Sequence, residues 1–235
     1  MAKAKNQKPA ESKAGELILN FIQNNRKKIL IGFIAIVVVL LGALLTVSIR
    51  DNIMESRLLQ LDEFERRFMD ILSIDEFNFT EDLAVERMNE IFILLDDLEN
   101  FQRRSFGFAL ARAHGLSADI FWFMSEWDLA ERAWMDSARA ARNTYLEPLS
   151  IFNAAVAAEQ QGNITGAIAH YRRVLELRDN FPSPARAQFA IGRLEESRQN
   201  YDDAMFAYRT LTLTWPNDSQ WASLAHSRII ALQNR

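Results

Sequence analysis

Three stretches of this chain repeat one pattern, and the clearest is residues 153–175, NAAVAAEQQGNITGAIAHYRRVL. The others are residues 117–139, SADIFWFMSEWDLAERAWMDSAR, and residues 189–211, FAIGRLEESRQNYDDAMFAYRTL. Equivalent positions 37 residues apart hold a small residue, an alanine and a large aromatic residue: Ala118, Ala155 and Gly192; Ala130, Ala167 and Ala204; Trp134, Tyr171 and Tyr208. A fixed period of this length is the sequence signature of a repeat array.

Within each unit the small residue precedes the alanine by 12 positions, and the aromatic residue follows the alanine by four. Small residues on two antiparallel helices let the helix axes approach closely, and an aromatic side chain one turn later fills the gap toward the next pair. The pattern therefore predicts stacked helical hairpins. We expect an all-α fold, with a single N-terminal transmembrane helix followed by an α-solenoid of such hairpins.

The spacing resembles that of the tetratricopeptide repeat. Gly162-Asn163 stands where that family places its Gly-Asp turn, and Trp215-Pro216 stands where it places its closing proline. The period departs from the family's, being 37 residues rather than 34, and the first two units lack the closing proline. Three extra residues in the turn between units would reconcile the two periods.

Four segments follow along the chain: a basic tail (1–28), a transmembrane helix (29–49), a stalk or packing helix (50–80) and a repeat domain with a C-terminal capping helix (81–235). The three clear units cover residues 111–218. Thr80 is expected to cap a helix over residues 82–98, which belongs to a fourth, degenerate unit. Before it, an apolar stripe at helical spacing predicts that the membrane helix continues outward and packs on the first repeat; the stripe is Met54, Leu58, Leu61, Phe64, Phe68 and Leu72.

Residues 29–49 form an uncharged run of 21 residues. As a helix this run spans about 31 Å, the thickness of the hydrocarbon core of a bilayer. The alternatives are a cleavable signal peptide and a buried core helix. The run is too long for a signal core, no clear small-x-small cleavage site follows it, and 28 residues precede it. We therefore expect an uncleaved single-pass anchor.

Charge predicts the orientation of this anchor, because Lys and Arg are retained on the cytoplasmic side. Residues 1–28 carry a net charge of +5, so the N-terminus is expected in the cytoplasm and the rest beyond the inner membrane, in the periplasm or extracytoplasmic space. All six lysines lie in that tail, and every basic residue after Arg50 is an arginine. Because the whole chain carries −4 and Arg50 adds +1, residues 51–235 carry −10. Nucleic acid is therefore not an expected partner.

The sequence offers no chemistry for catalysis. His114, His170 and His226 recur every 56 residues, but that interval is not a multiple of the repeat. No Cys, His or carboxylate at ligand spacing surrounds them, so we read them as ordinary surface or turn histidines and expect no metal site. The sequence has no phosphate loop, nucleophile elbow or zinc-protease helix motif. We expect no cofactor and no enzymatic activity.

Repeat solenoids bind chains, usually in the groove lined by the first helix of each pair. By repeat register, the partner-binding groove should present Arg112, Asp119, Trp122, Leu149, Phe152, Val156, Glu159, Arg186, Phe189, Arg193 and Glu196. This set mixes apolar side chains with arginines, as a peptide-binding surface does. The alternative is that Phe152, Val156 and Phe189 pack against the neighbouring helix. Arg186 and Arg193 do not reproduce the Lys and Asn pattern of carboxylate-clamp repeat proteins.

The layout of a basic tail, the single span KKILIGFIAIVVVLL, a helix of the type SRLLQLDEFERRF and degenerate repeats resembles the bacterial YfgM family of ancillary subunits of the SecYEG translocon. The resemblance implies periplasmic repeats that associate with translocon subunits and with periplasmic chaperones. It covers nearly the full length and rests on layout rather than on a diagnostic motif.

Two functions from different classes remain open. The first is an ancillary translocon or chaperone-network subunit that handles emerging, unfolded chains through weak binding in the groove. The second is a structural scaffold of a stable cell-envelope assembly, such as a motility or outer-membrane-assembly complex, with a large apolar interface. An exposed stripe of Trp122, Trp127 and Trp221 on the outer face would favour the scaffold. A homo-oligomer is possible but carries no signal, because the span lacks small residues spaced four apart around Gly32 and Gly42.

Overall fold

The computed structural model describes residues 11–73, 80–177 and 181–234, and every regular element within these ranges is an α-helix. The helices are α1 (Glu11–Leu72), α2 (Glu81–Gln102), α3 (Gly107–Phe123), α4 (Trp127–Ala140), α5 (Leu146–Gln160), α6 (Ile164–Glu176), α7 (Pro184–Ser197), α8 (Tyr201–Thr214) and α9 (Ser219–Gln233). The chain divides into two compact units, Met1–Ser56 and Arg57–Arg235. The predicted all-α fold, with one apolar N-terminal helix and a solenoid of tetratricopeptide type, is confirmed.

The first unit contains the candidate membrane span. Residues Gln23–Thr46 of α1 form a stretch of 24 residues that is long and apolar enough to cross a membrane. Its side chains are exposed, and none of the stretch is buried within the unit, unlike a helix in the core of a soluble domain. Length and composition make it a possible span.

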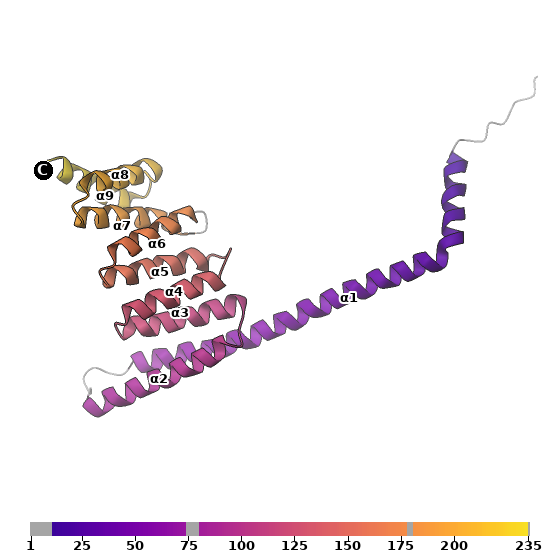
Figure 1. Cartoon of the computed structure of the whole chain (residues 1–235), viewed down its shortest axis with the longest axis horizontal. Helices are drawn as coiled ribbons and strands as arrows, with labels where there is room; N and C mark the ends of the chain where they lie inside the picture. The colour runs from indigo at the N-terminus through magenta and orange to yellow at the C-terminus, as the bar shows by residue number, and fades with distance from the viewer. Residues whose placement is uncertain (1–10, 74–79, 178–180, 235) are drawn as a thin grey trace, which may run out of the picture. The chain divides into compact units, whose positions relative to one another are not determined.

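The second unit contains the repeats. The hairpins α3–α4, α5–α6 and α7–α8 stack in chain order, and α9 follows the last of them (Figure 1). The residues at the predicted repeat positions are buried between helices; they are Ala118, Ala155 and Gly192, Ala130, Ala167 and Ala204, and Trp134, Tyr171 and Tyr208. At Gly192 the helices approach so closely that an added Cβ would lie 2.6 Å from the ring of Tyr208. The physical basis predicted for the repeat, close helix contact at small residues, is therefore present.

The turns inside the three hairpins share one backbone conformation. Ser125, Gly162 and Gln199, each 37 residues after the last, have φ values of 61°, 76° and 63°, in the left-handed region. In each turn, the backbone amide of the left-handed residue and the backbone amide of the residue after it donate hydrogen bonds to carbonyl oxygens of the preceding helix. These bonds are 2.9–3.0 Å long and form a Schellman motif. Asn163 then caps α6, because its side chain accepts a hydrogen bond from the amide of Gly166 at 3.0 Å.

The C-terminal part of α1 and the whole of α2 form an antiparallel hairpin before the first clear repeat. The predicted cap is confirmed, since the hydroxyl oxygen of Thr80 accepts a hydrogen bond from the amide of Leu83 at 3.2 Å. In the hairpin, the rings of Phe64 and Phe101 meet edge to face at 5.6 Å, and Arg67 pairs with Asp97 at 2.7 Å. The same part of α1 also contacts α3, where the rings of Phe68 and Phe123 lie 6.1 Å apart, so the predicted packing on the first repeat is confirmed.

Candidate functional site

Three cavities follow the first helices of the hairpins, and we call them the N-terminal, middle and C-terminal cavities. The N-terminal cavity lies between α1, α3 and α4 and has a volume of about 650 Å³. The middle cavity, of about 330 Å³, lies between α3, α5 and α7, and the C-terminal cavity, of about 550 Å³, lies between α7, α8 and α9. The first two share Asp119, Trp122 and Trp134, so they form one continuous groove.

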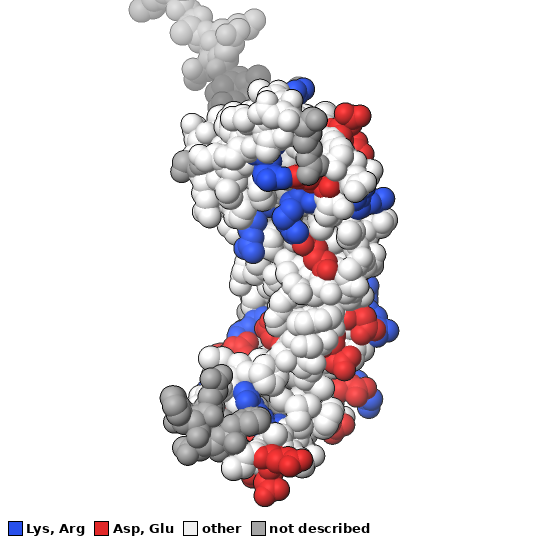
Figure 2. All heavy atoms as spheres, turned by 90° about the vertical axis from the view of Figure 1, so that its left-hand side faces the viewer, with Lys and Arg blue, Asp and Glu red and all other residues white. Residues whose placement is uncertain are grey.

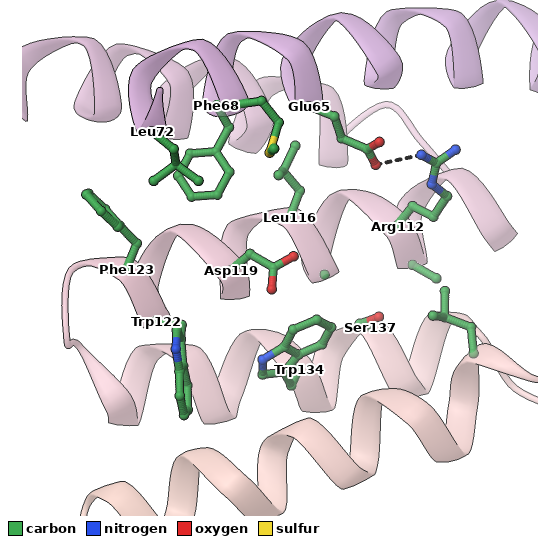
Figure 3. Close-up of a pocket in the computed structure, with 14 residues that line it drawn as sticks. Glu65, Phe68, Leu72, Arg112, Leu116, Asp119, Trp122, Phe123, Trp134 and Ser137 are labelled. Carbon is green, nitrogen blue, oxygen red and sulfur yellow. Dashed lines mark hydrogen bonds and ion pairs between the residues drawn. The ribbon is translucent and has the colours of Figure 1, made fainter. Parts of the chain in front are cut away.

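The walls of the N-terminal cavity are mainly apolar. Phe68 and Leu72 project from α1, Leu116 from α3, and Trp134 from α4 (Figure 3). The small Gly115 makes room here, since a Cβ at that position would lie 3.3 Å from the Trp134 ring. A cavity of this size with apolar walls and a few polar groups is typical of a binding site.

Two groups of charges lie in this cavity. At one end, Arg112 of α3 pairs with Glu65 of α1 at 2.6 Å and with Asp62 at 3.3 Å. Nearer the centre, the carboxyl group of Asp119 lies between Leu116 and Trp134 (Figure 3). The Asp119 side chain is exposed on its cavity side, and neighbouring protein atoms displace part of its hydration. This desolvation, together with the nearby negative charge of Glu65, raises the pKa of Asp119 to about 6.

In the middle cavity, Phe152 adopts the packed arrangement that the sequence left open as the alternative. Its ring is buried, stacked on Phe181 with ring centres 5.2 Å apart, and packed on Tyr171. The guanidinium of Arg186 lies 4.7 Å from the centre of the Phe152 ring, at cation–π distance. Phe152 therefore forms the floor of the cavity, and Arg186 lies above it in the same lining. Val156 lines this cavity and is half-buried.

Two sets of polar side chains connect successive repeats, and we call each set a polar clasp. In the first clasp, Glu159 of α5 accepts a hydrogen bond of 2.6 Å from the hydroxyl of Tyr171 and pairs with Arg193 of the next hairpin. The second clasp repeats the arrangement. Glu196 accepts from the hydroxyl of Tyr208 at 3.1 Å and pairs with Arg228 of α9. Arg193, predicted as a free groove residue, is thus engaged within the protein.

The first repeat has no such clasp. The positions 37 residues before Glu159, Tyr171 and Arg193 are Trp122, Trp134 and Val156. Three apolar side chains therefore replace an acid, a phenol and a base, and all three line the joined N-terminal and middle cavities. The groove changes along its length from an apolar section to a clasped, charged section.

The eleven predicted groove residues occupy all three cavities or the clasps beside them. Arg112, Asp119 and Trp122 line the N-terminal cavity; Leu149, Phe152, Val156 and Arg186 line the middle cavity; Phe189, Arg193 and Glu196 line the C-terminal cavity; Glu159 belongs to the first clasp. Whether they bind a partner stays a prediction. The sequence prediction missed Glu65 and Phe68, because it read the stalk helix only as packing. It also missed Trp134, whose repeat position marked it as a core residue.

Trp122, Trp127 and Trp221 do not form the outer stripe that would have favoured a scaffold. Trp122 lines the groove and packs against Trp127, with ring centres 4.7 Å apart. Trp221 packs against Phe189 at 5.4 Å. Their rings are paired inside the repeat unit, so this stripe gives no support to a scaffold.

Charge on the outside is unevenly placed. On the face drawn in Figure 2, acidic and basic side chains alternate along one edge, and uncharged surface covers much of the middle. Within the described ranges, no three His, Cys, Asp or Glu side chains are grouped closely enough to hold a metal ion.

Comparison with known proteins identifies the repeats. Residues 116–180 and 174–218 match the model of the tetratricopeptide repeat family. A curated TPR repeat-containing protein of Treponema pallidum (strain Nichols) is 38% identical over 126 residues, which make up 54% of this chain and 52% of the relative. This chain therefore spans about half the length of that relative. The crystal structure of the apo form of RapI has 12% identity and a TM-score of 0.30 over 67% of this chain and 72% of its own, a similarity too low to carry an argument.

Proposed function

We propose that this chain, whose residues 116–218 match tetratricopeptide repeats, is a membrane-anchored protein that binds other proteins at the outer face of the inner membrane. Tetratricopeptide repeats imply protein–protein interaction, and no catalytic family is indicated. The observation that carries the proposal is the continuous apolar groove along α3, α5 and α7. Its walls can bury apolar side chains of a partner, and its few polar groups can orient them.

The finer role that we propose is that of an ancillary subunit of the protein-export channel or of the periplasmic chaperone network. Two features support it. The apolar section of the groove suits weak contact with many unfolded sequences, because apolar contact is non-directional. The basic tail, possible span and degenerate repeats also follow the layout that resembles the translocon-associated family.

Photo-crosslinking from single positions tests this proposal. A photoreactive phenylalanine at Asn153, which lines the middle cavity, is compared with one at Arg132, an exposed position on α4. We expect crosslinks to translocon subunits, folding factors or exported chains from Asn153 and none from Arg132. Equal labelling from both positions, or none from Asn153, contradicts binding in the groove. Charge reversal at Arg193 is a poor substitute, because it would also break the first clasp.

The second candidate, a scaffold in a stable envelope assembly, is favoured by a different observation. Phe206 and Leu213 lie seven residues apart on α8, with 73% and 82% of their surface exposed. Exposed apolar side chains at this spacing share one helix face and suit a permanent protein contact. The same photoreactive residue at Phe206 tests this function. A stoichiometric crosslink to one envelope protein from Phe206, with none from Asn153, supports the scaffold and contradicts the export role.

A further inference from the structure

In the part of the chain that the structure describes, no polar clasp crosses the junction between the first and second repeats, where the N-terminal cavity joins the middle cavity. At the equivalent positions of the other repeats, a carboxylate accepts a hydrogen bond from a tyrosine hydroxyl and pairs with an arginine. Here Trp122, Trp134 and Val156 replace them, and no hydrogen bond or ion pair of the described residues joins these three side chains. Each tryptophan ring has a large apolar surface and a single hydrogen-bond donor. The two rings therefore cannot form a clasp with each other, but they can pack against a bound partner, which we call the guest.

The balance of charge in this cavity is negative. Among the residues that the structure describes, the lining contains two carboxylates, Glu65 of α1 and Asp119 of α3, and one cation, Arg112. Arg112 pairs with Glu65 and with Asp62, which lies outside the lining.

Two further cations lie beside the lining, and each covers an aromatic ring: Arg186 of α7 lies over Phe152, and Arg87 of α2 lies 4.9 Å from the centre of the Phe123 ring. From α4 and α5, the lining contains no charged side chain. Asp119 therefore has no ion-pair partner among the described residues.

Ionising an unpaired carboxyl group beside largely apolar walls costs free energy, because the carboxylate loses part of its hydration. A cation that pairs with the carboxylate offsets this loss. An acidic guest would instead place another negative charge beside Glu65 and Asp119. The residues on either side of the basic residue should be apolar, because burial of the tryptophan and phenylalanine surface supplies most of the binding free energy. A short apolar segment with one basic side chain meets both conditions.

We propose that the N-terminal cavity binds an apolar peptide segment that carries one Lys or Arg side chain, with Asp119 pairing with the cation. This inference rests on the proposed function of the groove in binding proteins and defines the chemistry of the segment that it prefers. Because the pKa of Asp119 is about 6, the preference for a cation is present above that pH and falls below it.

The test uses the full chain in lipid nanodiscs and three fluorescently labelled peptides of the type Leu-Leu-X-Leu-Leu, in which X is arginine, citrulline or glutamate. Citrulline has the shape of arginine without its charge. At pH 7.5, the arginine peptide should bind about five to ten times more tightly than the citrulline peptide, and the glutamate peptide most weakly. Fluorescence anisotropy measures the affinities, and empty nanodiscs correct for binding to lipid.

Asp119→Asn should abolish the preference for arginine over citrulline by lowering the affinity for the arginine peptide to that for the citrulline peptide. The matched control is Asp128→Asn, at an exposed position of α4 away from the cavity, which should keep the preference. Circular dichroism establishes that each variant is folded. Equal binding of the arginine and citrulline peptides to wild type, no binding of either, or an unchanged preference in Asp119→Asn overturns the inference. The groove function itself falls only if the Asn153 crosslinks are also absent.

Discussion

The hydroxyl of Tyr171 donates a hydrogen bond of 2.6 Å to Glu159, and the same carboxylate pairs with Arg193 of the following repeat. One buried phenol thus connects the second helix of a hairpin to its first helix, and through the glutamate to the next hairpin. Burial and the neighbouring carboxylate raise the pKa of Tyr171, so the phenol remains a donor at every physiological pH.

Removing this hydroxyl should destabilise the repeats. Tyr171→Phe keeps the ring but leaves Glu159 with one partner fewer, and hydrogen bonds to charged groups contribute about 1.5–3 kcal/mol. The equivalent bond of Tyr208 is longer, at 3.1 Å, so Tyr208→Phe should cost less. Urea unfolding followed by circular dichroism gives both values. Equal losses would contradict the predicted ranking of the two bonds, and no loss at Tyr171 would show that its hydroxyl adds nothing to stability.

The left-handed turn residues allow a stabilising change. Gln199 has a φ of 63° at the position where the second repeat has Gly162. Non-glycine residues are disfavoured in this region by about 1–2 kcal/mol, so Gln199→Gly should stabilise the protein by about 1 kcal/mol. The opposite substitution is Gly162→Ala, which should destabilise the protein by a similar free energy of about 1 kcal/mol. No atom lies within 4 Å of the added Cβ of that alanine, so its cost comes from the backbone alone. Thermal unfolding measures both, and a loss of stability in Gln199→Gly would refute the account of the turn.

The two buried helix glycines should respond differently to alanine. At Gly192 the new Cβ would lie 2.6 Å from the ring of Tyr208, which is fully buried, so Gly192→Ala should destabilise by about 1–3 kcal/mol. At Gly115 the nearest atom, on Trp134, is 3.3 Å away. The gain in helix propensity, about 1 kcal/mol, should then nearly offset the contact, leaving Gly115→Ala within about 1 kcal/mol of wild type. Similar losses in the two variants would contradict the close approach at Gly192.

Stability should depend on pH through Asp119. Its pKa is raised in the folded protein from 3.8 to about 6, so the folded state binds this proton more tightly than the unfolded state does. The resulting stabilisation is complete below about pH 4 and is lost as the pH rises through about 6. Asp119→Asn, which cannot ionise, should therefore melt at a higher temperature than wild type at pH 8 and near the wild-type temperature at pH 4. A lower melting temperature for the variant at pH 8 would rule out an unfavourable charge.

The orientation of the proposed anchor can be measured with two reagents that do not cross membranes. All six lysines lie in residues 1–28, and the chain has no cysteine. In intact cells with a permeable outer envelope, an amine reagent should leave the tail unmodified, because the tail faces the cytoplasm. A thiol reagent should label Ser223→Cys, an exposed position on α9. Detergent lysis should expose the lysines and provides the control. Labelling of lysine before lysis would mean that the orientation is reversed.

The sequence predicted the positions that follow from packing and missed those that depend on the reach of long side chains. Ala118, Gly192 and Tyr208 were identified because close helix contact requires small and aromatic residues at a fixed spacing. For Phe152 the sequence could not decide between the groove and packing, since nothing in the repeat register indicates that Phe181 stacks on its ring or that Arg186 covers it. The N-terminal cavity needs Glu65 and Phe68 of a helix outside the repeat, so spacing within the repeat cannot reveal it.

The Glu159–Arg193 and Glu196–Arg228 ion pairs close the wall of the groove at the second and third repeats, whereas the first repeat has only packed rings at that level. The two ends of the groove should therefore differ in selectivity. Where ion pairs lock the spacing of the helices, a guest must match a fixed width. Where tryptophan rings line the wall, rotation of a side chain can admit guests of different bulk without separating opposite charges. We expect the end of the groove beside α1 to accept partner segments of different sizes, and the end beside α9 to accept a narrower range.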